Sequence, residues 1–264
     1  MSAGYISQWM WQTARRINAA HLGRSLAGHW PFPVRVKVTG GHSMYVDLRS
    51  TIGRGLFATG TFDMAAIEPA LSALSPGATY IDVGANIGFY AVLAAERVGP
   101  TGRVYCFEID SRPLRAFRKT VATFPLKNIE IVKVAVAATD GIVSFKQARD
   151  HGHNRIDPSG ATGNAIRSVR LDTWVALRRL ERVDVIKIDV EGAEYLVLDG
   201  AREMIARFKP TIICEAMHGT PGFAHGPADV VALLQAHQYE VQYLPGVHTP
   251  TVFARPEIAA ARKA

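Results

Sequence analysis

Short apolar runs alternate with amphipathic stretches over most of the chain. The runs at 79–83, 103–109 and 129–136 predict buried strands. The stretches at 88–98 and 111–124 carry apolar residues at helical spacing and predict helices between those strands. Strands that alternate with helices in this way predict an α/β fold with a mostly parallel sheet and helices on both faces.

The alternation is interrupted at 141–173 and then resumes. Within the interruption, 142–148 and 166–173 predict strands that flank a polar loop at 149–164. A long loop inside a compact domain is usually functional, so we expect 147–165 to help shape a binding pocket. The remaining predicted elements are a strand at 183–190, a helix from Ala193 to Ile205, a strand at 210–217, a helix at 227–238 and strands at 239–244 and 251–254.

Shorter patterns precede the alternating region. The segments 34–38 and 43–48 flank Gly40-Gly41 and predict a β-hairpin, and the second half of 53–77 predicts a helix that ends at Pro76-Gly77. The opening residues predict a helix packed against the main domain through an apolar stripe of Trp9, Trp11, Ile17 and Leu22.

These elements divide the chain into three parts. Residues 1–60 form an N-terminal extension of helix and hairpin, residues 61–255 form the α/β domain, and residues 256–264 form a C-terminal tail. We expect 34–76 to contribute to the same pocket as the polar loop.

The composition is that of a globular protein, with 48% hydrophobic and 20% charged residues among 264. The formal charge is +7, but Lys and Arg form no long basic run, so we expect no nucleic-acid partner. Cys106 and Cys214 fall in predicted buried strands, which points to a reducing compartment. No apolar run reaches the roughly 18 residues of a membrane span, and the first residues lack the order of a signal peptide. We therefore expect a cytoplasmic protein, either monomeric or oligomeric.

Polar residues follow several predicted strands at the edge of the sheet where ligands bind. In an open α/β sheet this edge is the carboxyl end of the strands. Most of the residues there are acidic. They are Asp82, Gly84 and Asn86 after the first strand, Glu108 after the second, Asp189, Glu191 and Gly192 after the fourth, and Glu215 and His218 after the fifth.

The first of these strands leads into a turn, Gly84-x-x-x-Gly88, that differs from phosphate-binding turns. A dinucleotide site needs Gly-x-Gly-x-x-Gly and a P-loop needs Gly-Lys-Ser/Thr, and neither pattern occurs here. The Asp82 carboxylate would also repel a phosphate. A cationic nucleoside without phosphate fits instead, and S-adenosylmethionine (SAM) is the candidate. We expect Gly84 and Gly88 to let the backbone approach it, and Glu108 to accept hydrogen bonds from its ribose hydroxyls.

Four segments resemble the FkbM-type family of SAM-dependent methyltransferases in their order and spacing. They are "YIDVGANIGFYAVLAA", "GRVYCFEID", "SVRLDTW" and "DVIKIDVEGAEYLVLDGA". The resemblance implies a Rossmann-like class I methyltransferase fold with a seven-stranded sheet. It places Asp82, Gly84, Asn86 and Glu108 at cofactor positions.

The resemblance also implies a reaction. SAM would donate a methyl group to a hydroxyl of a sugar or glycan, a lipid or another small secondary metabolite, and S-adenosylhomocysteine would be the second product. One departure is Ile109, where the family often has proline after the ribose-binding acid. Because the carboxylate itself is kept, this affects the following turn rather than the cofactor contact.

Methyl transfer to an alcohol is helped by a base that takes the hydroxyl proton. Histidine suits this role near neutral pH, so His153 in the polar loop and His218 after the fifth strand are candidate catalytic bases. Asp189 is a third catalytic candidate, for acceptor orientation or acid–base work. Lys187 is expected to form a structural ion pair with Asp189 or Glu215.

A divalent cation is another way to activate an alcohol. Asp189, Glu191 and Glu215 are ligands of the type that Mg²⁺ accepts, but their spacing matches no named metal motif, so no metal is assigned. Glu194 falls in the first turn of a predicted helix, where the helix dipole favours a carboxylate.

Two other functions stay open at this point. An NAD-dependent oxidoreductase is opposed by the missing third glycine and by Asp82. A SAM-binding partner subunit without catalysis would keep the cofactor site and transfer no methyl group.

Overall fold

The computed structural model describes residue 30 and residues 32–148, 155–157, 163–216, 223–244 and 250–257. Its centre is a seven-stranded sheet in the order β12-β13-β11-β10-β3-β4-β5. β13 is antiparallel to both of its neighbours and the other adjacent pairs are parallel, so the predicted mostly parallel sheet is confirmed. The strands are β3 (Thr79–Val83), β4 (Arg103–Phe107), β5 (Ile129–Val132), β10 (Val185–Ile188), β11 (Thr211–Glu215), β12 (Tyr239–Tyr243) and β13 (Thr251–Pro256).

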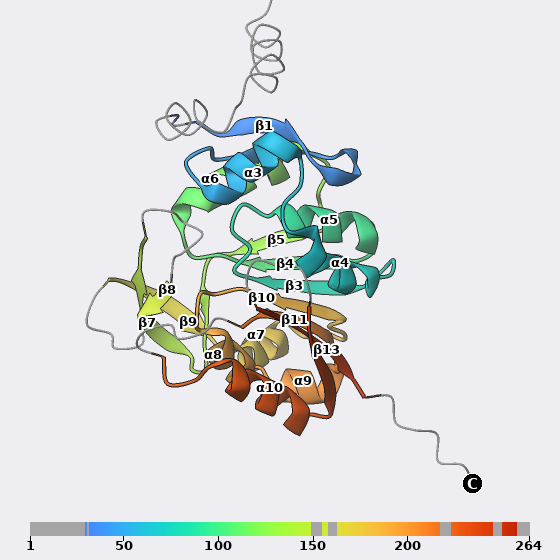
Figure 1. Cartoon of the computed structure of the whole chain (residues 1–264), viewed down its shortest axis with the longest axis vertical. Helices are drawn as coiled ribbons and strands as arrows, with labels where there is room; N and C mark the ends of the chain where they lie inside the picture. Colours follow the sequence, from blue (N-terminus) through green and yellow to red (C-terminus); the bar gives the residue numbers. More distant parts are fainter. Residues whose placement is uncertain are drawn as a thin grey trace, which may run out of the picture.

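Helices cover both faces of this sheet (Figure 1). All of β3 is buried, and its residues alternate between two cores, so that Tyr80 packs toward one face and Ile81 toward the other. The helices are α4 (Met64–Ser72), α5 (Phe89–Val98) and α6 (Ser111–Thr123) on one side, and α7 (Leu171–Arg178), α8 (Glu194–Asp199), α9 (Arg202–Phe208) and α10 (Pro227–Ala236) on the other. Nowhere in the described ranges does a helix combine the length and the apolar character needed to cross a bilayer.

The strand order reverses between β3 and β10. From β3 the chain proceeds outward to β4 and β5, and it later returns to place β10 on the other side of β3. The crevice at such a reversal opens at the carboxyl ends of the strands. The β3–β10 register sets Asp82 beside Lys187 in the middle of the sheet.

The predicted N-terminal hairpin is confirmed and shares a core with the central sheet. β1 (Val34–Lys37) and β2 (Ser43–Val46) pair antiparallel around the short 3-10 helix η1 (Thr39–Gly41). Val36 and Met44 pack in the same core as Tyr80. The backbone N–H of Tyr45 donates to Thr120 Oγ1 at 2.8 Å, which joins β2 to α6.

Helix α3 (Thr51–Thr59) is not predicted by the sequence. Its two glycines, Gly53 and Gly55, lower the helix propensity of the segment. A Cβ at Gly53 would lie 1.9 Å from the carbonyl oxygen of Asp47, so close packing requires this glycine. Ser50 compensates by capping the helix, because its hydroxyl accepts the N–H of Gly53 at 2.9 Å.

Together with β6, which precedes the interruption in the alternating pattern, residues of the interruption form a separate four-stranded sheet. Its order is β6-β9-β7-β8. The single strand predicted at 129–136 is therefore wrong, because β5 joins the central sheet and β6 joins this one. β8 falls within the segment that the sequence predicts as a loop. The strands are β6 (Ala135–Val136), β7 (Gly141–Lys146), β8 (Arg155–Asp157) and β9 (Asn164–Val169).

Two further predictions are corrected by long-range packing. The strand predicted at 166–173 ends at Val169, because Asp172 turns inward in α7 and accepts the N–H of Met204 at 2.8 Å. The helix predicted from Ala193 to Ile205 is two helices, α8 and α9. At the break, a Cβ on Gly200 would lie 2.2 Å from the carbonyl oxygen of Ala137, so the small sheet packs directly on this backbone.

Candidate active site

A cavity of about 260 Å³ opens where β3, β4, β10 and β11 end. Its lining includes most of the acidic residues predicted at this edge. The pocket contributions expected from 34–76 and 147–165 are also present, through α3, α4 and β8. The lining includes Gly84, Asn86, Glu108, Asp189, Glu191 and Glu215 at the strand ends, Phe62 and Asp63 before α4, Tyr90 on α5, Ile156 on β8 and Lys187 on β10.

The turn after β3 brings its backbone against the backbone that follows β10. Gly84 has a φ of +81°, and a Cβ there would lie 1.8 Å from the carbonyl oxygen of Asp189. A side chain at this position would force the two strand ends apart. The N–H groups of Gly84 and Ala85 both donate to the carbonyl of Phe107, at 2.9 and 3.0 Å, which ties the turn to β4. Gly84 is thus required for three strand ends to meet at the cavity.

Gly88 serves helix packing. It has a φ of +80° at the start of α5, and a Cβ there would lie 2.2 Å from the ring of Phe117 on α6. Packing against Phe117 is by itself a sufficient reason for a glycine at this position, and no contact with a ligand is needed to explain it. Contact between Gly88 and a cofactor stays a prediction.

Asn86 and Glu108 form the wall of the cavity between β3 and β4. The N–H of Asn86 donates to Glu108 Oε2, and the N–H of Asp110 donates to Oε1, both at 2.8 Å. Each carboxylate oxygen keeps acceptor capacity for another donor. Burial raises the pKa of Glu108 to about 7, although these two N–H groups oppose the shift. The buried side-chain oxygen of Asn86 has no hydrogen-bond partner within the described residues, so the wall offers acceptors to a polar ligand.

Asp82 lies beneath the cavity and is fully buried. Lys187 Nζ is 3.3 Å from Asp82 Oδ1 and 3.1 Å from Asp189 Oδ2. It also donates to the carbonyl oxygen of Gly84 at 2.9 Å. Burial alone would lower the pKa of Lys187, but Asp189 and Asp82 outweigh it and raise the pKa, so the ammonium stays charged.

The predicted pairing of Lys187 with Asp189 is confirmed, and the pairing with Asp82 is an addition. From the sequence, the Asp82 carboxylate is expected to repel phosphates. In the structure, Lys187 offsets the negative charge of Asp82. Direct contact between Asp82 and a cofactor stays a prediction. The signal available in the sequence was an acid and a lysine inside two neighbouring strands that are otherwise apolar.

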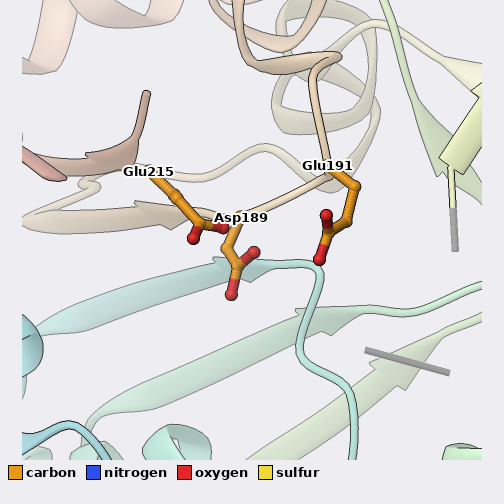
Figure 2. Close-up of side chains that lie close together, drawn as sticks. All are labelled: Asp189, Glu191 and Glu215. Atoms are coloured by element: carbon orange, nitrogen blue, oxygen red, sulfur yellow. The ribbon is translucent and has the colours of Figure 1, made fainter. Parts of the chain in front are cut away.

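Three carboxylates converge at the ends of β10 and β11 (Figure 2). Asp189, Glu191 and Glu215 each bring an oxygen within 4.8 Å of the others. Glu191 has a φ of +56° and Gly192 a φ of +105°, so the chain turns sharply here. Oxygens grouped in this way can hold Mg²⁺ or accept hydrogen bonds from hydroxyl groups. These are the three candidate cation ligands that the sequence suggests.

Glu194 closes the same turn from below. Its buried carboxylate accepts the N–H groups of Val190 and Gly192 at 3.2 and 2.9 Å. Burial raises its pKa to about 7, against the effect of these hydrogen bonds. Glu194 therefore shapes the loop that carries Asp189 and Glu191.

The predicted bases His153 and His218 lie outside the described residues, so their roles stay predictions. No histidine occurs in the described lining of the cavity. Asp189, with a side chain 35% exposed, is the catalytic candidate that lies on the cavity wall. Tyr90 also lines the cavity, and burial raises its pKa far above neutrality, so it is a wall residue rather than a base.

Comparison with known families matches the Methyltransferase FkbM domain to residues 82–241. The chain belongs to this family. The motif resemblance is thereby confirmed, and the matched range of the FkbM methyltransferase domain begins at Asp82 and includes the strand-end residues of the cavity. The strand order described above is the Rossmann-like class I methyltransferase fold that the sequence predicts.

Individual relatives of this FkbM-family chain are distant. The 2-O-methyltransferase NoeI of Sinorhizobium fredii is 26% identical over 150 residues, which cover 50% of this chain and 60% of NoeI. Among solved structures, a methyltransferase FkbM from Methylobacillus flagellatus is 18% identical with a TM-score of 0.48, covering 75% of this chain and 52% of its own. Aeropyrum pernix fibrillarin, solved in complex with SAM, is 16% identical with a TM-score of 0.47. The match covers 86% of this chain and 84% of the fibrillarin chain.

Proposed function

We propose that this chain is a SAM-dependent methyltransferase that methylates a hydroxyl of an uncharged or cationic acceptor, such as a small molecule, a glycan or the neutral part of a lipid. The observation that carries the proposal is a cavity rich in hydrogen-bond acceptors at the strand reversal of an FkbM-family domain. Family membership favours this function over the oxidoreductase alternative. The name of NoeI, a 2-O-methyltransferase, supports oxygen as the atom that receives the methyl group.

The residues of the cavity fit SAM. The buried oxygen of Asn86, which has no partner within the described ranges, and the Glu108 carboxylate would accept the hydroxyl groups of a ribose. Gly84 leaves its part of the wall without a side chain. The carboxylates of Glu191 and Glu215 suit the positive charge that SAM carries at its sulfur and amino groups.

The charge of the cavity restricts the acceptor. The described lining contains five carboxylates, namely Asp63, Glu108, Asp189, Glu191 and Glu215, and Lys187 as its one cation. At an effective dielectric constant of about 20, a phosphate about 5 Å from one carboxylate is disfavoured by about 3 kcal/mol. An acceptor with a phosphate or carboxylate near its reacting hydroxyl is therefore a poor substrate.

The proposed mechanism assigns the chain mainly a positioning role. SAM supplies a methyl carbon activated by a positively charged sulfur. The acceptor oxygen must lie in line with the bond between that sulfur and the methyl carbon. Asp189 would orient the acceptor hydroxyl and take its proton, a contribution of about 10² to 10⁴ in rate. Lys187, at 3.1 Å, would hold the Asp189 carboxylate in place. His153 and His218 remain the alternative bases.

Calorimetry with S-adenosylhomocysteine tests the cofactor site. We expect Glu108→Ala to weaken binding about 100-fold, because two hydrogen bonds to a charged group are lost at about 1.5 kcal/mol each. Glu240→Ala is the matched control, since this β12 carboxylate is 70% exposed and outside the cavity. The cofactor assignment fails if the intact chain does not bind, or if the two variants bind equally well.

Transfer of labelled methyl groups from SAM tests the acceptor class. We expect neutral methyl glycosides and amino sugars to be labelled at least about tenfold faster than the corresponding sugar phosphates. Asp189→Asn should retain S-adenosylhomocysteine binding and lose most of the transfer rate. Equal labelling of sugar phosphates would contradict the charge argument and leave the cofactor assignment intact.

A further inference from the structure

The positive charge of the chain is concentrated in two segments. Residues 1–46 contain five Lys or Arg and no Asp or Glu, and residues 111–129 also contain five and none. Of the totals of 30 basic and 23 acidic residues, 20 basic and all 23 acidic residues remain elsewhere. The net charge of +7 therefore divides into +10 in these two segments and −3 in the rest of the chain.

The two segments meet where the N-terminal hairpin packs on α6. Lys119 Nζ lies 4.2 Å from the centre of the Tyr45 ring on β2. That ring stacks on Phe124 with 6.2 Å between centroids, and the guanidinium of Arg35 on β1 lies 5.3 Å from the Phe124 ring. A continuous row of contacts thus joins cations from both segments. Figure 1 shows the hairpin and α6 at the end of the molecule opposite α9 and α10.

Four cations at this contact, Arg35, Arg115, Arg118 and Lys119, have no acidic partner in the part of the chain that the structure describes. Arg112, in the same segment, pairs with Asp110 at 2.7 Å and is not counted among them. Arg115, Arg118 and Lys119 are exposed at a spacing that places them on one face of α6. Some exposed arginines elsewhere are paired, for example Arg182 with Asp184 at 2.6 Å. We define the basic face as Phe32, Arg35, Tyr45, Arg115, Arg118 and Lys119.

Exposed aromatic side chains lie beside these cations. Phe32 is 59% exposed, and its ring lies 6.0 Å from the Arg115 guanidinium. Trp30, two residues earlier, is 46% exposed. Cations with exposed aromatic rings suit the headgroup region of a bilayer, where the cations meet lipid phosphates and the rings enter the interface.

We propose that the basic face docks the chain on the surface of an anionic lipid membrane. The face supplies the charge opposite to that of the membrane, and the acidic residues are excluded from both segments that form it. Each exposed cation near such a surface contributes about a factor of five in binding. This proposal does not depend on the methyl acceptor.

Sedimentation of the full chain with vesicles tests this. The chain should bind vesicles of phosphatidylcholine mixed with phosphatidylglycerol, lose that binding as salt rises, and ignore pure phosphatidylcholine. The variant Arg115→Gln/Arg118→Gln/Lys119→Gln should bind about 100-fold more weakly. The control variant Lys146→Gln/Arg167→Gln/Arg207→Gln changes three exposed cations outside both segments and should bind like the unmodified chain.

Three outcomes would overturn the proposal. The first is no binding of the unmodified chain to the anionic vesicles. The second is an equal loss in both triple variants, which would assign the binding to overall charge. The third is equally tight binding of a mixed-sequence RNA with the same dependence on α6, which would assign the face to nucleic acid.

Discussion

Replacing Lys187 by methionine should destabilise the fold by about 3–5 kcal/mol, because it leaves a buried carboxylate without its counter-charge. Asp82 is fully buried, and its oxygens accept no hydrogen bond from any described residue. The ammonium 3.3 Å away is the charge that compensates it. The double variant Asp82→Asn/Lys187→Met removes both charges and should recover most of the loss. A remainder of about 1–2 kcal/mol should persist, because Lys187 also donates to Gly84.

Urea unfolding followed by circular dichroism measures this change. The midpoint should fall with an unchanged slope, and the melting temperature should drop by about 10 °C, at about 2–4 °C per kcal/mol for a chain of this size. Burial raises the pKa of Asp82 and Lys187 opposes this shift, so without the lysine the folded variant holds a proton that the unfolded chain releases. Its free energy of unfolding should therefore decrease as pH rises above about 4, more steeply than in the unmodified chain.

The exposed Lys146→Met on β7 serves as the control and should change the free energy of unfolding by less than about 0.5 kcal/mol. A Lys187→Met variant as stable as this control would refute the reasoning. So would a double variant no more stable than the single one, since that would show that the Asp82 charge is not what destabilises it.

Two other predictions follow from the cavity. Burial raises the pKa of Glu108 to about 7, so the affinity for S-adenosylhomocysteine should rise by up to about tenfold per pH unit as pH approaches 7 and then level off. Calorimetry should show that the affinity of Glu108→Gln does not change over the same pH range. Gly84→Ala should unfold at lower temperature and lose cofactor binding, because its Cβ would meet Asp189 at 1.8 Å. Gly77→Ala is its control: φ is +83° there, but the nearest atom is 3.7 Å away, so the cost is backbone strain of about 1–2 kcal/mol without loss of binding. Equal effects of the two glycine variants would contradict the close-approach argument.

Local periodicity correctly predicted the elements in which the apolar positions of the sequence are the ones that become buried. β3, β4 and α6 follow apolar patterns that any neighbouring layer would bury in the same way. The failures lie where a distant contact decides the local conformation. Helix α7 begins at Leu171, where Asp172 finds backbone donors in α9, and the break before α9 follows from the approach of Gly200 to the small sheet.

The sequence by itself determined the fold class, the family and the strand-end residues that face the cavity. These depend on alternating apolar runs and on short motifs, which are local properties of the chain. Only the tertiary structure decided how the charges are used. It pairs Lys187 with Asp82 across two strands, groups three carboxylates from the ends of β10 and β11, and joins two acid-free segments into one basic face. Electrostatic energy depends on separation and burial in space, and neither can be read from positions along a chain.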